Sequence, residues 1–175
     1  MNVPAFALSI VVLSFASLSY GANDQPPPLY TASIQSSSDA VNESDTSKRI
    51  ILRAQELIGT PYKWGGTSEE TGFDCSGLLV YLFRSEAGVE LPRTTKVMIN
   101  EGFPRIDRAD LQPGDAVFFK HGDQGQVNHV GLYIGDNQFI HSPRTGKTIR
   151  TDSLDNRYWN ERYFDSLRFT EESSS

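Results

Sequence analysis

The spacing of apolar residues changes midway along this chain. Residues 50–58 repeat apolar side chains at helical intervals, and a second such segment runs from Cys75 to Phe83 and closes at Gly88. From Ala116 onward the apolar residues occur instead in short runs bounded by turn residues, which is typical of strands. Helices followed by antiparallel strands predict an α+β domain.

The strand-like segments lie in the second half of the chain. The turn Gly135-Asp136-Asn137 separates two of them so closely that we expect an antiparallel hairpin. The predicted strands are Ala116–Phe119, His129–Ile134, Gln138–His141, Lys147–Thr151 and Arg162–Phe169.

The start of the chain has the composition of a targeting segment. Residues 5–18 form a run of apolar and small side chains, about as long as the core of a signal peptide and shorter than the roughly 20 residues of a membrane-spanning helix. Small residues at Ser19 and Gly21 favour cleavage before Ala22. We therefore expect a signal peptide over 1–21 and an exported protein, periplasmic or secreted. An uncleaved hydrophobic anchor is the alternative.

Two further segments differ from the domain in composition. Residues 22–47 are rich in Ser and Pro with scattered Asn, Asp and Glu, and 171–175 are Ser and Glu, so neither can bury enough apolar surface to fold. We expect a flexible linker, one domain over 48–170, and a disordered tail. A net charge of −6 excludes a broad positive field, so nucleic acid is not an expected partner. After processing we expect a soluble protein with no stable membrane insertion.

Cys75 is the only cysteine of the chain. It follows Asp74, a residue suited to cap a helix, and the first turn of a helix is expected to lower a thiol pKa. Backbone N–H groups there can also receive an oxyanion. We therefore predict a nucleophile; the alternative is a small buried hydrophobic residue.

Histidine is the expected base for such a thiol. His129 begins one strand of the predicted hairpin and His141 ends the other, so their imidazoles should lie near each other. Satisfied structural histidines are the alternative. His121 stands in a predicted loop and receives no role. A zinc site is a further alternative for Cys75, His129 and His141, but their spacing matches no standard ligand set, so we expect no metal and no cofactor.

Short motifs follow one another along the domain: Pro61–Gly66, Asp74–Gly77, Leu91–Thr94, Gly114-Asp115, His129–Gly135, Phe139–His141, Tyr158-Trp159 and Arg162-Tyr163. In kind, order and spacing they resemble the NlpC/p-sixty family of papain-like cell-wall peptidases, and most closely its murein endopeptidases. The resemblance implies a papain-like fold, in which N-terminal helices pack on an antiparallel sheet. It also implies hydrolysis of amide bonds in peptidoglycan stem peptides.

The resemblance assigns the catalytic roles as well. Cys75 would be the nucleophile, His129 the base, and His141 the polar residue that orients His129. Tyr62 would assist the oxyanion or hold substrate, although a packed aromatic is the alternative. Asp74 would lie near the substrate, or would only cap the helix.

Two more residues match positions near the family's substrate cleft. They are Ser76 and Arg93, and Arg93 would bind a substrate carboxylate or form a structural ion pair.

The resemblance to murein endopeptidases, with no accessory domain evident, implies that the bond cut is the D-alanyl–diaminopimelate cross-link. The Ser- and Pro-rich segment before Lys48 cannot build the rigid wall that would close one end of the cleft around a free stem N-terminus. The alternatives are a D-glutamyl–diaminopimelate endopeptidase, a secreted antibacterial wall-degrading toxin met by an immunity protein, an inactive wall-binding module, and an acyltransferase. Two departures from the family's murein endopeptidases are a missing lipidated cysteine and a longer loop over His121–Asn128.

Overall fold

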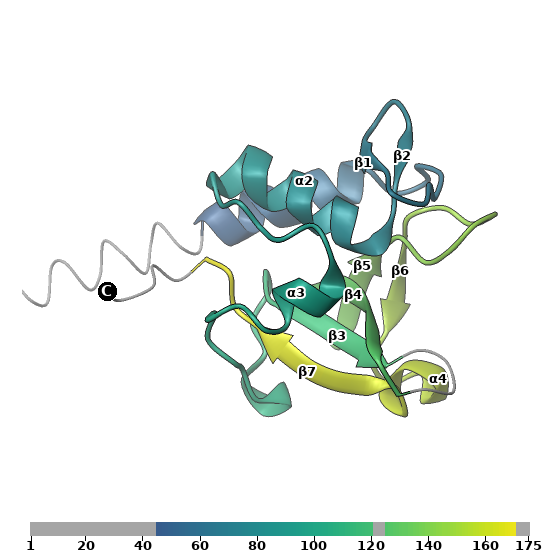
Figure 1. Cartoon of the computed structure of the whole chain (residues 1–175). Coiled ribbons are helices and arrows are strands. Elements are labelled where there is room, and N and C mark those ends of the chain that lie inside the picture. Colours follow the sequence, from purple (N-terminus) through teal and green to yellow (C-terminus); the bar gives the residue numbers. More distant parts are fainter. Residues whose placement is uncertain (1–44, 121–124, 171–175) are drawn as a thin grey trace, which may run out of the picture.

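The computed structural model describes residues 45–120 and 125–170 (Figure 1). The predicted signal peptide, the tail and residues 121–124 of the longer loop lie outside the described residues, as does most of the predicted linker. Residues 45–56 are helical, so this helix already includes 45–47, before the predicted domain start at Lys48. No helix within the described ranges has the length and apolar character needed to cross a membrane.

Helices precede a five-stranded antiparallel sheet, and the α+β prediction is confirmed. The helix over 45–56 is followed by β1 (Thr67–Ser68), β2 (Gly72–Phe73), α2 (Cys75–Ala87), α3 (Thr95–Met98) and the 3₁₀ turn η1 (Arg108–Asp110). The sheet has the order β6-β5-β4-β3-β7. Its strands are β3 (Ala116–Lys120), β4 (Val127–Gly135), β5 (Gln138–His141), β6 (Arg150–Ser153) and β7 (Tyr163–Leu167), with α4 (Arg157–Asn160) between the last two.

Helix α2 begins and ends where the sequence predicts. The Asp74 carboxylate accepts the Gly77 N–H at 2.7 Å, which satisfies one of the free donors of the first turn. Gly88 adopts a left-handed φ of 68°, and its N–H returns to the Arg84 carbonyl. Because the cap is the residue before Cys75, the same interaction that starts the helix fixes the position of the thiol.

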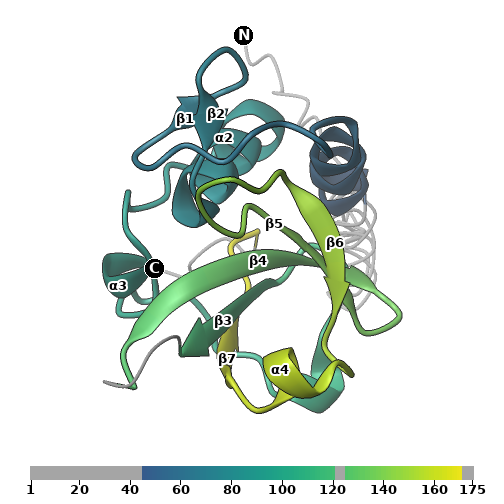
Figure 2. The ribbon, with the colours of Figure 1, turned by 90° about the vertical axis from the view of Figure 1, so that its right-hand side faces the viewer.

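The sheet buries side chains on both faces. Along β3, Phe118 packs into the core beneath the helices, whereas Val117 and Phe119 pack into a second core against Trp159 of α4. Successive side chains of a strand point to opposite faces, so a strand buried on both sides is apolar throughout. Figure 2 shows the curved sheet between α2 on one side and α4 on the other.

The predicted hairpin is formed by β4 and β5. Asp136 and Asn137 have φ values of 49° and 55°, the pair of left-handed residues that a two-residue turn of type I′ requires. Tyr133 pairs with Phe139 across the hairpin. His129 and His141 are separated from these two residues by even numbers of positions, so both imidazoles lie on the face covered by α4.

Two predicted strands are shifted or shortened. A turn closed by the Lys147 N–H on the Arg144 carbonyl delays β6 beyond the predicted start at Lys147. β7 covers Tyr163–Leu167, less than predicted. The helices α3 and α4 and the β1–β2 pair were not predicted, because elements of two to four residues are too short to show a periodic pattern.

Candidate active site

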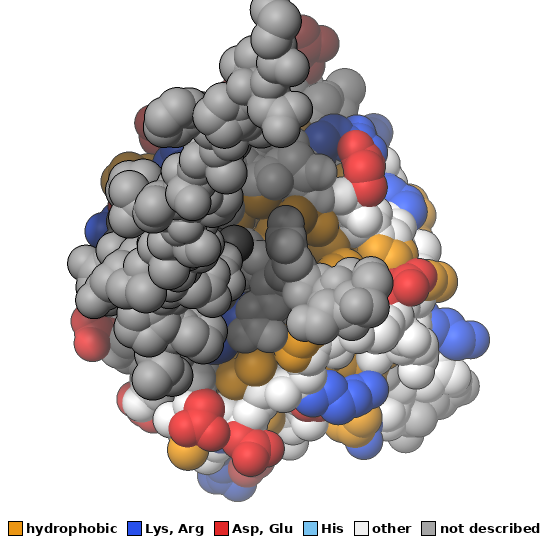
Figure 3. Space-filling model, turned by 90° about the vertical axis from the view of Figure 1, so that its left-hand side faces the viewer, with side chains coloured by type: hydrophobic (Ala, Val, Ile, Leu, Met, Phe, Trp, Pro, Cys, Tyr) orange, Lys and Arg blue, Asp and Glu red, His pale blue; other side chains and the backbone are white. Residues whose placement is uncertain are grey.

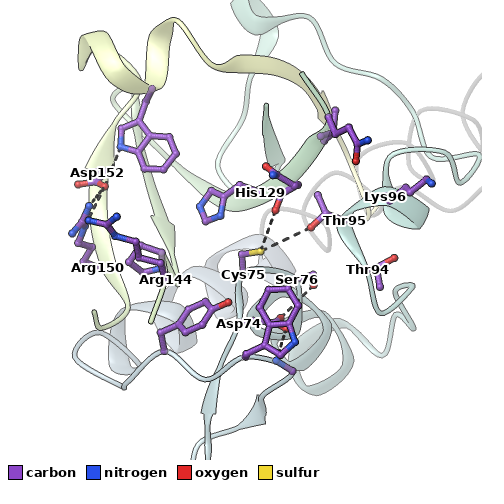
Figure 4. Close-up of a pocket in the computed structure, with 18 of the residues that line it drawn as sticks. Asp74, Cys75, Ser76, Thr94, Thr95, Lys96, His129, Arg144, Arg150 and Asp152 are labelled. Atoms are coloured by element: carbon purple, nitrogen blue, oxygen red, sulfur yellow. Dashed lines mark hydrogen bonds and ion pairs between the residues drawn. The ribbon is translucent and has the colours of Figure 1, made fainter. Parts of the chain in front are cut away.

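A cleft of about 970 Å³ opens between the start of α2 and the α4 face of the sheet (Figure 4). Its walls come from α2, α3, the first residues of β4, the loop after β5, β6 and α4. Six of the seven predicted site residues line it: Tyr62, Asp74, Cys75, Ser76, Arg93 and His129. The seventh, His141, is fully buried behind His129.

The Cys75 sulfur faces strand β4. It lies 3.9 Å from the Thr95 hydroxyl and 3.9 Å from the Asn128 carbonyl oxygen, and in Figure 4 the His129 imidazole stands beside it. The start of α2 can reach this position because residue 77 is glycine. A Cβ at Gly77 would overlap the carbonyl oxygen of Gly66.

The sequence expectation of a lowered thiol pKa is not met. Burial raises the pKa of Cys75 above its ordinary value, and the neighbouring Asp74 carboxylate raises it further, although the Thr95 hydroxyl opposes both. The capping residue therefore brings negative charge to the helix end that was expected to favour the thiolate. A thiol in this environment needs a base to remove its proton.

The two histidines meet, as the hairpin predicts. His129 Nε2 lies 2.8 Å from His141 Nδ1, and both side chains are buried. Trp159 stacks on the His129 ring at 5.4 Å between ring centroids and 23° between planes. Gly131, two residues after His129 on β4, lets β5 pack closely: a Cβ there would lie 2.6 Å from the Phe139 ring and 3.3 Å from the His141 Cβ.

Asp152 extends this pair and was missed from the sequence. Its Oδ2 lies 2.9 Å from His141 Nε2 and 3.0 Å from the Trp159 indole nitrogen, and Arg150 Nη2 donates to it at 2.8 Å. The sequence did contain a hint of this contact. A predicted strand follows the one that ends at His141, and Arg150 and Asp152 lie two positions apart, so their side chains share one face.

Burial and hydrogen bonding act in opposite directions on this pair. Burial lowers the pKa of His141, although Asp152 acts to raise it. For Asp152, burial disfavours ionisation, but hydrogen bonds from His141 and Arg150 outweigh it and hold the pKa well below its ordinary value. Asp152 is therefore a carboxylate and His141 a neutral imidazole near neutral pH.

Arg93 is engaged within the protein. Its guanidinium binds both oxygens of the Asp74 carboxylate, at 3.0 and 2.6 Å, and donates to the Ser76 hydroxyl at 2.9 Å. Asp74 meanwhile caps α2 and accepts the Gly65 N–H at 3.0 Å. This arrangement favours the structural ion pair over a substrate carboxylate contact for Arg93, and it ties the cleft wall to the start of α2.

The rim of the cleft carries exposed aromatic and basic side chains. Trp64 is 84% exposed, and Lys96 and Arg144 also line the opening. Burial raises the pKa of Tyr62, and the nearby Cys75 raises it further. None of the described residues hydrogen-bonds the Tyr62 hydroxyl group. Tyr62 can therefore donate a hydrogen bond to a ligand.

No cluster of three or more metal-ligating side chains occurs between residues 45 and 170, the uncertain segment 121–124 apart. On the face drawn in Figure 3, acidic and basic side chains are interspersed around exposed apolar ones.

Comparisons with known proteins agree with this geometry. The model of the NlpC/P60 family matches residues 59–168. The chain is similar to murein DD-endopeptidase MepH of Escherichia coli K12, at 42% identity over 124 residues, which are 70% of this chain and 45% of MepH. It is also similar to murein DD-endopeptidase MepS/murein LD-carboxypeptidase of the same strain, at 35% identity over 176 residues, 95% of this chain and 90% of that protein.

A solved structure shows the same fold. An NlpC/P60 family protein from Bacillus cereus superposes with a TM-score of 0.66 at 35% identity, covering 71% of this chain and 40% of that one. The chain thus spans less than half of MepH and of the Bacillus cereus protein, and most of MepS.

Proposed function

Since this chain belongs to the NlpC/P60 family, we propose that it is a cysteine peptidase that hydrolyses peptide bonds of peptidoglycan. The observation that carries the proposal is the meeting of Cys75, at the start of α2, with His129 in one cleft, where the buried His141 bonds His129 from behind. A thiol, a base and a residue that orients the base are the parts of a nucleophilic hydrolase. Relatives named murein DD-endopeptidases support peptidoglycan as the substrate.

The reaction follows from these positions. His129 takes the proton from Cys75 as the sulfur attacks the carbonyl carbon of the scissile amide. The resulting oxyanion would be met by the free N–H groups of the first helical turn and by the Tyr62 hydroxyl. His129 then gives its proton to the leaving amine, which departs and leaves a thioester. Water, deprotonated by His129, attacks the thioester, releases the new carboxylate and restores the thiol.

The finer assignment is the D-alanyl–diaminopimelate cross-link. It rests on the relatives MepS and MepH, which are named murein DD-endopeptidases, and on a cleft whose walls come from several separate elements. Stem peptides are acidic, and two basic side chains, Lys96 and Arg144, line the cleft without an ion pair to any described residue.

Purified protein incubated with cross-linked dimeric muropeptides tests the assignment. We expect monomers with intact tetrapeptide stems, detected by mass analysis, and none from a Cys75→Ala variant that retains its fold. Dimers that stay whole, together with free L-alanyl–D-glutamate from monomeric substrates, would contradict the bond assignment and leave the cysteine mechanism standing.

Such a substrate requires export. Residues 5–18, with Ser19 and Gly21, support cleavage before Ala22 and a periplasmic or secreted mature protein. N-terminal sequencing of periplasmic or extracellular protein should begin at Ala22, whereas intact Met1 in a membrane fraction would contradict export of a soluble form.

A further inference from the structure

The hydrogen bonds behind His129 all lead to one carboxylate oxygen. Oδ2 of Asp152 receives His141 Nε2, the Trp159 indole N–H, and both Nη2 and Nε of Arg150, the last at 3.1 Å. An arginine and an indole can only donate, so this oxygen is an acceptor in every one of these bonds. It follows that His141 Nε2 carries a hydrogen.

The position of that hydrogen fixes the next one. His141 is fully buried, and burial keeps it neutral, so its Nδ1 holds a lone pair when Nε2 is protonated. At 2.8 Å from this lone pair, His129 Nε2 must be the donor. A neutral His129 that carries its hydrogen on Nε2 presents a lone pair on Nδ1.

We propose that Asp152 is a positioning residue that sets the tautomers of His141 and His129, so that Nδ1 of His129 is the atom that accepts the Cys75 proton. The inference deepens the proposed function and rests on it for the identity of the nucleophile. Trp159 contributes twice, because the indole that donates to Asp152 also stacks on the His129 ring and limits its rotation.

The proton balance requires no transfer beyond His129. When Nδ1 receives the thiol proton, His129 becomes an imidazolium whose Nε2–H still donates to His141, and Asp152 stays ionised. Cys75 from α2 stands beside the imidazolium and His141 from β5 bonds it, while Asp152 and Arg150 from β6 lie beyond His141. The carboxylate stabilises the positive charge, and Arg150 opposes it in part.

A purely structural role would have Asp152 only anchor Arg150 to the strand. The two roles differ in what replacement does to the histidines. Asp152→Asn keeps an oxygen where Arg150 and Trp159 direct their hydrogens, so it retains the tautomers and removes only the negative charge. Asp152→Leu removes the acceptor. Asp155→Asn is the matched control, because Asp155 is exposed, bonds only Asn137 through its side chain and does not line the cleft.

The test uses two readouts that need no peptidoglycan, so a wrong substrate assignment would not affect them. Two-bond ¹H–¹⁵N correlation spectra of the imidazoles should show hydrogen on Nε2 of both His129 and His141 in the parent protein, in Asp152→Asn and in Asp155→Asn. The rate at which iodoacetamide alkylates Cys75, followed against pH, should show its acid limb at lower pH in Asp152→Asn, since the imidazolium loses a stabilising charge.

In Asp152→Leu we expect mixed tautomers and alkylation at pH 7 slowed by about 10²-fold, the lower range of what a general base contributes. The parent spectrum keeps the proposal falsifiable even if this variant does not fold. Hydrogen on Nδ1 of neutral His129 in the parent protein would overturn the proposal. So would a folded Asp152→Leu protein with unchanged tautomers and an alkylation rate within about twofold of the parent.

Discussion

The proposed catalytic residues differ in how strongly each replacement should reduce the rate. Cys75→Ala should leave no measurable hydrolysis, since the acyl-enzyme cannot form, and His129→Ala should lower kcat/KM by about 10²–10⁴-fold because the thiol loses its proton acceptor. His141→Asn should be milder, because an amide can still accept the His129 Nε2–H. Rates of muropeptide cleavage by the three variants, each shown to be folded by circular dichroism, test this order. A greater loss in His141→Asn than in His129→Ala would mean that the two roles are reversed.

For single residues, the sequence pointed to the proposed nucleophile and both histidines, but not to Asp152, which bonds His141. Cys75 could be singled out because it is the only cysteine, and His129 and His141 because they bracket a recognisable turn. Asp152 could not, since a carboxylate in a polar stretch has the same local pattern whether it faces solvent or a buried imidazole. The pKa expectation for Cys75 failed for a related reason: the effect of Asp74 and of burial depends on distances that spacing along the chain does not give.

Among the elements, the β4–β5 hairpin is the one on which the site depends most. Gly131 packs against β5, and a methyl group there would press on Phe139 and His141. We expect Gly131→Ala to cost about 1–3 kcal/mol of stability, as overpacking does, and to reduce activity by separating the imidazoles. Thermal melts and cleavage rates measure the two effects.

Gly102→Ala provides the control for that substitution. Apart from its neighbours along the chain, nothing lies within 4 Å of the position that its Cβ would take, so the substitution should change neither stability nor activity appreciably. Equal behaviour of the two variants would contradict the role given to Gly131.

Elements with their own local signals were predicted well. Asp74 and Gly88 bound α2 as expected, and the Asp136-Asn137 turn gave the hairpin. The short helix α4 was not predicted, although Trp159 from it closes the second core and contacts both histidines. Its position is set by tertiary packing, which no four-residue pattern encodes. The family resemblance itself is confirmed by the family match over residues 59–168.

For the whole molecule, the hydrogen-bonded pair His141 and Asp152 predicts how the free energy of unfolding depends on pH. His141 has a folded pKa below its ordinary value of 6.5, so the unfolded chain binds a proton first and stability falls as the pH drops below about 6.5. Asp152 likewise has a lowered pKa, so its contribution is complete above its ordinary value of 3.8 and is lost progressively as the pH falls below it.

We therefore expect two successive losses of stability on acidification, the first with a slope of up to about 1.4 kcal/mol per pH unit for one proton. Unfolding by urea between pH 4 and 8 measures the first loss, and unfolding below pH 3.8 measures the second. The first loss should be absent in His141→Asn, and a parent protein whose stability is constant from pH 8 to 5 would contradict this account.

The stacking of Trp159 on His129 gives the protein an optical signal of its own. The chain has two tryptophans. Trp159 is buried, whereas Trp64 is 84% exposed to solvent. A protonated imidazole quenches the emission of an indole that it touches. In a Trp64→Phe variant, blue-shifted fluorescence should fall as His129 is protonated, and a titration with no such step would contradict it. The enzyme can then be followed during turnover without an added dye.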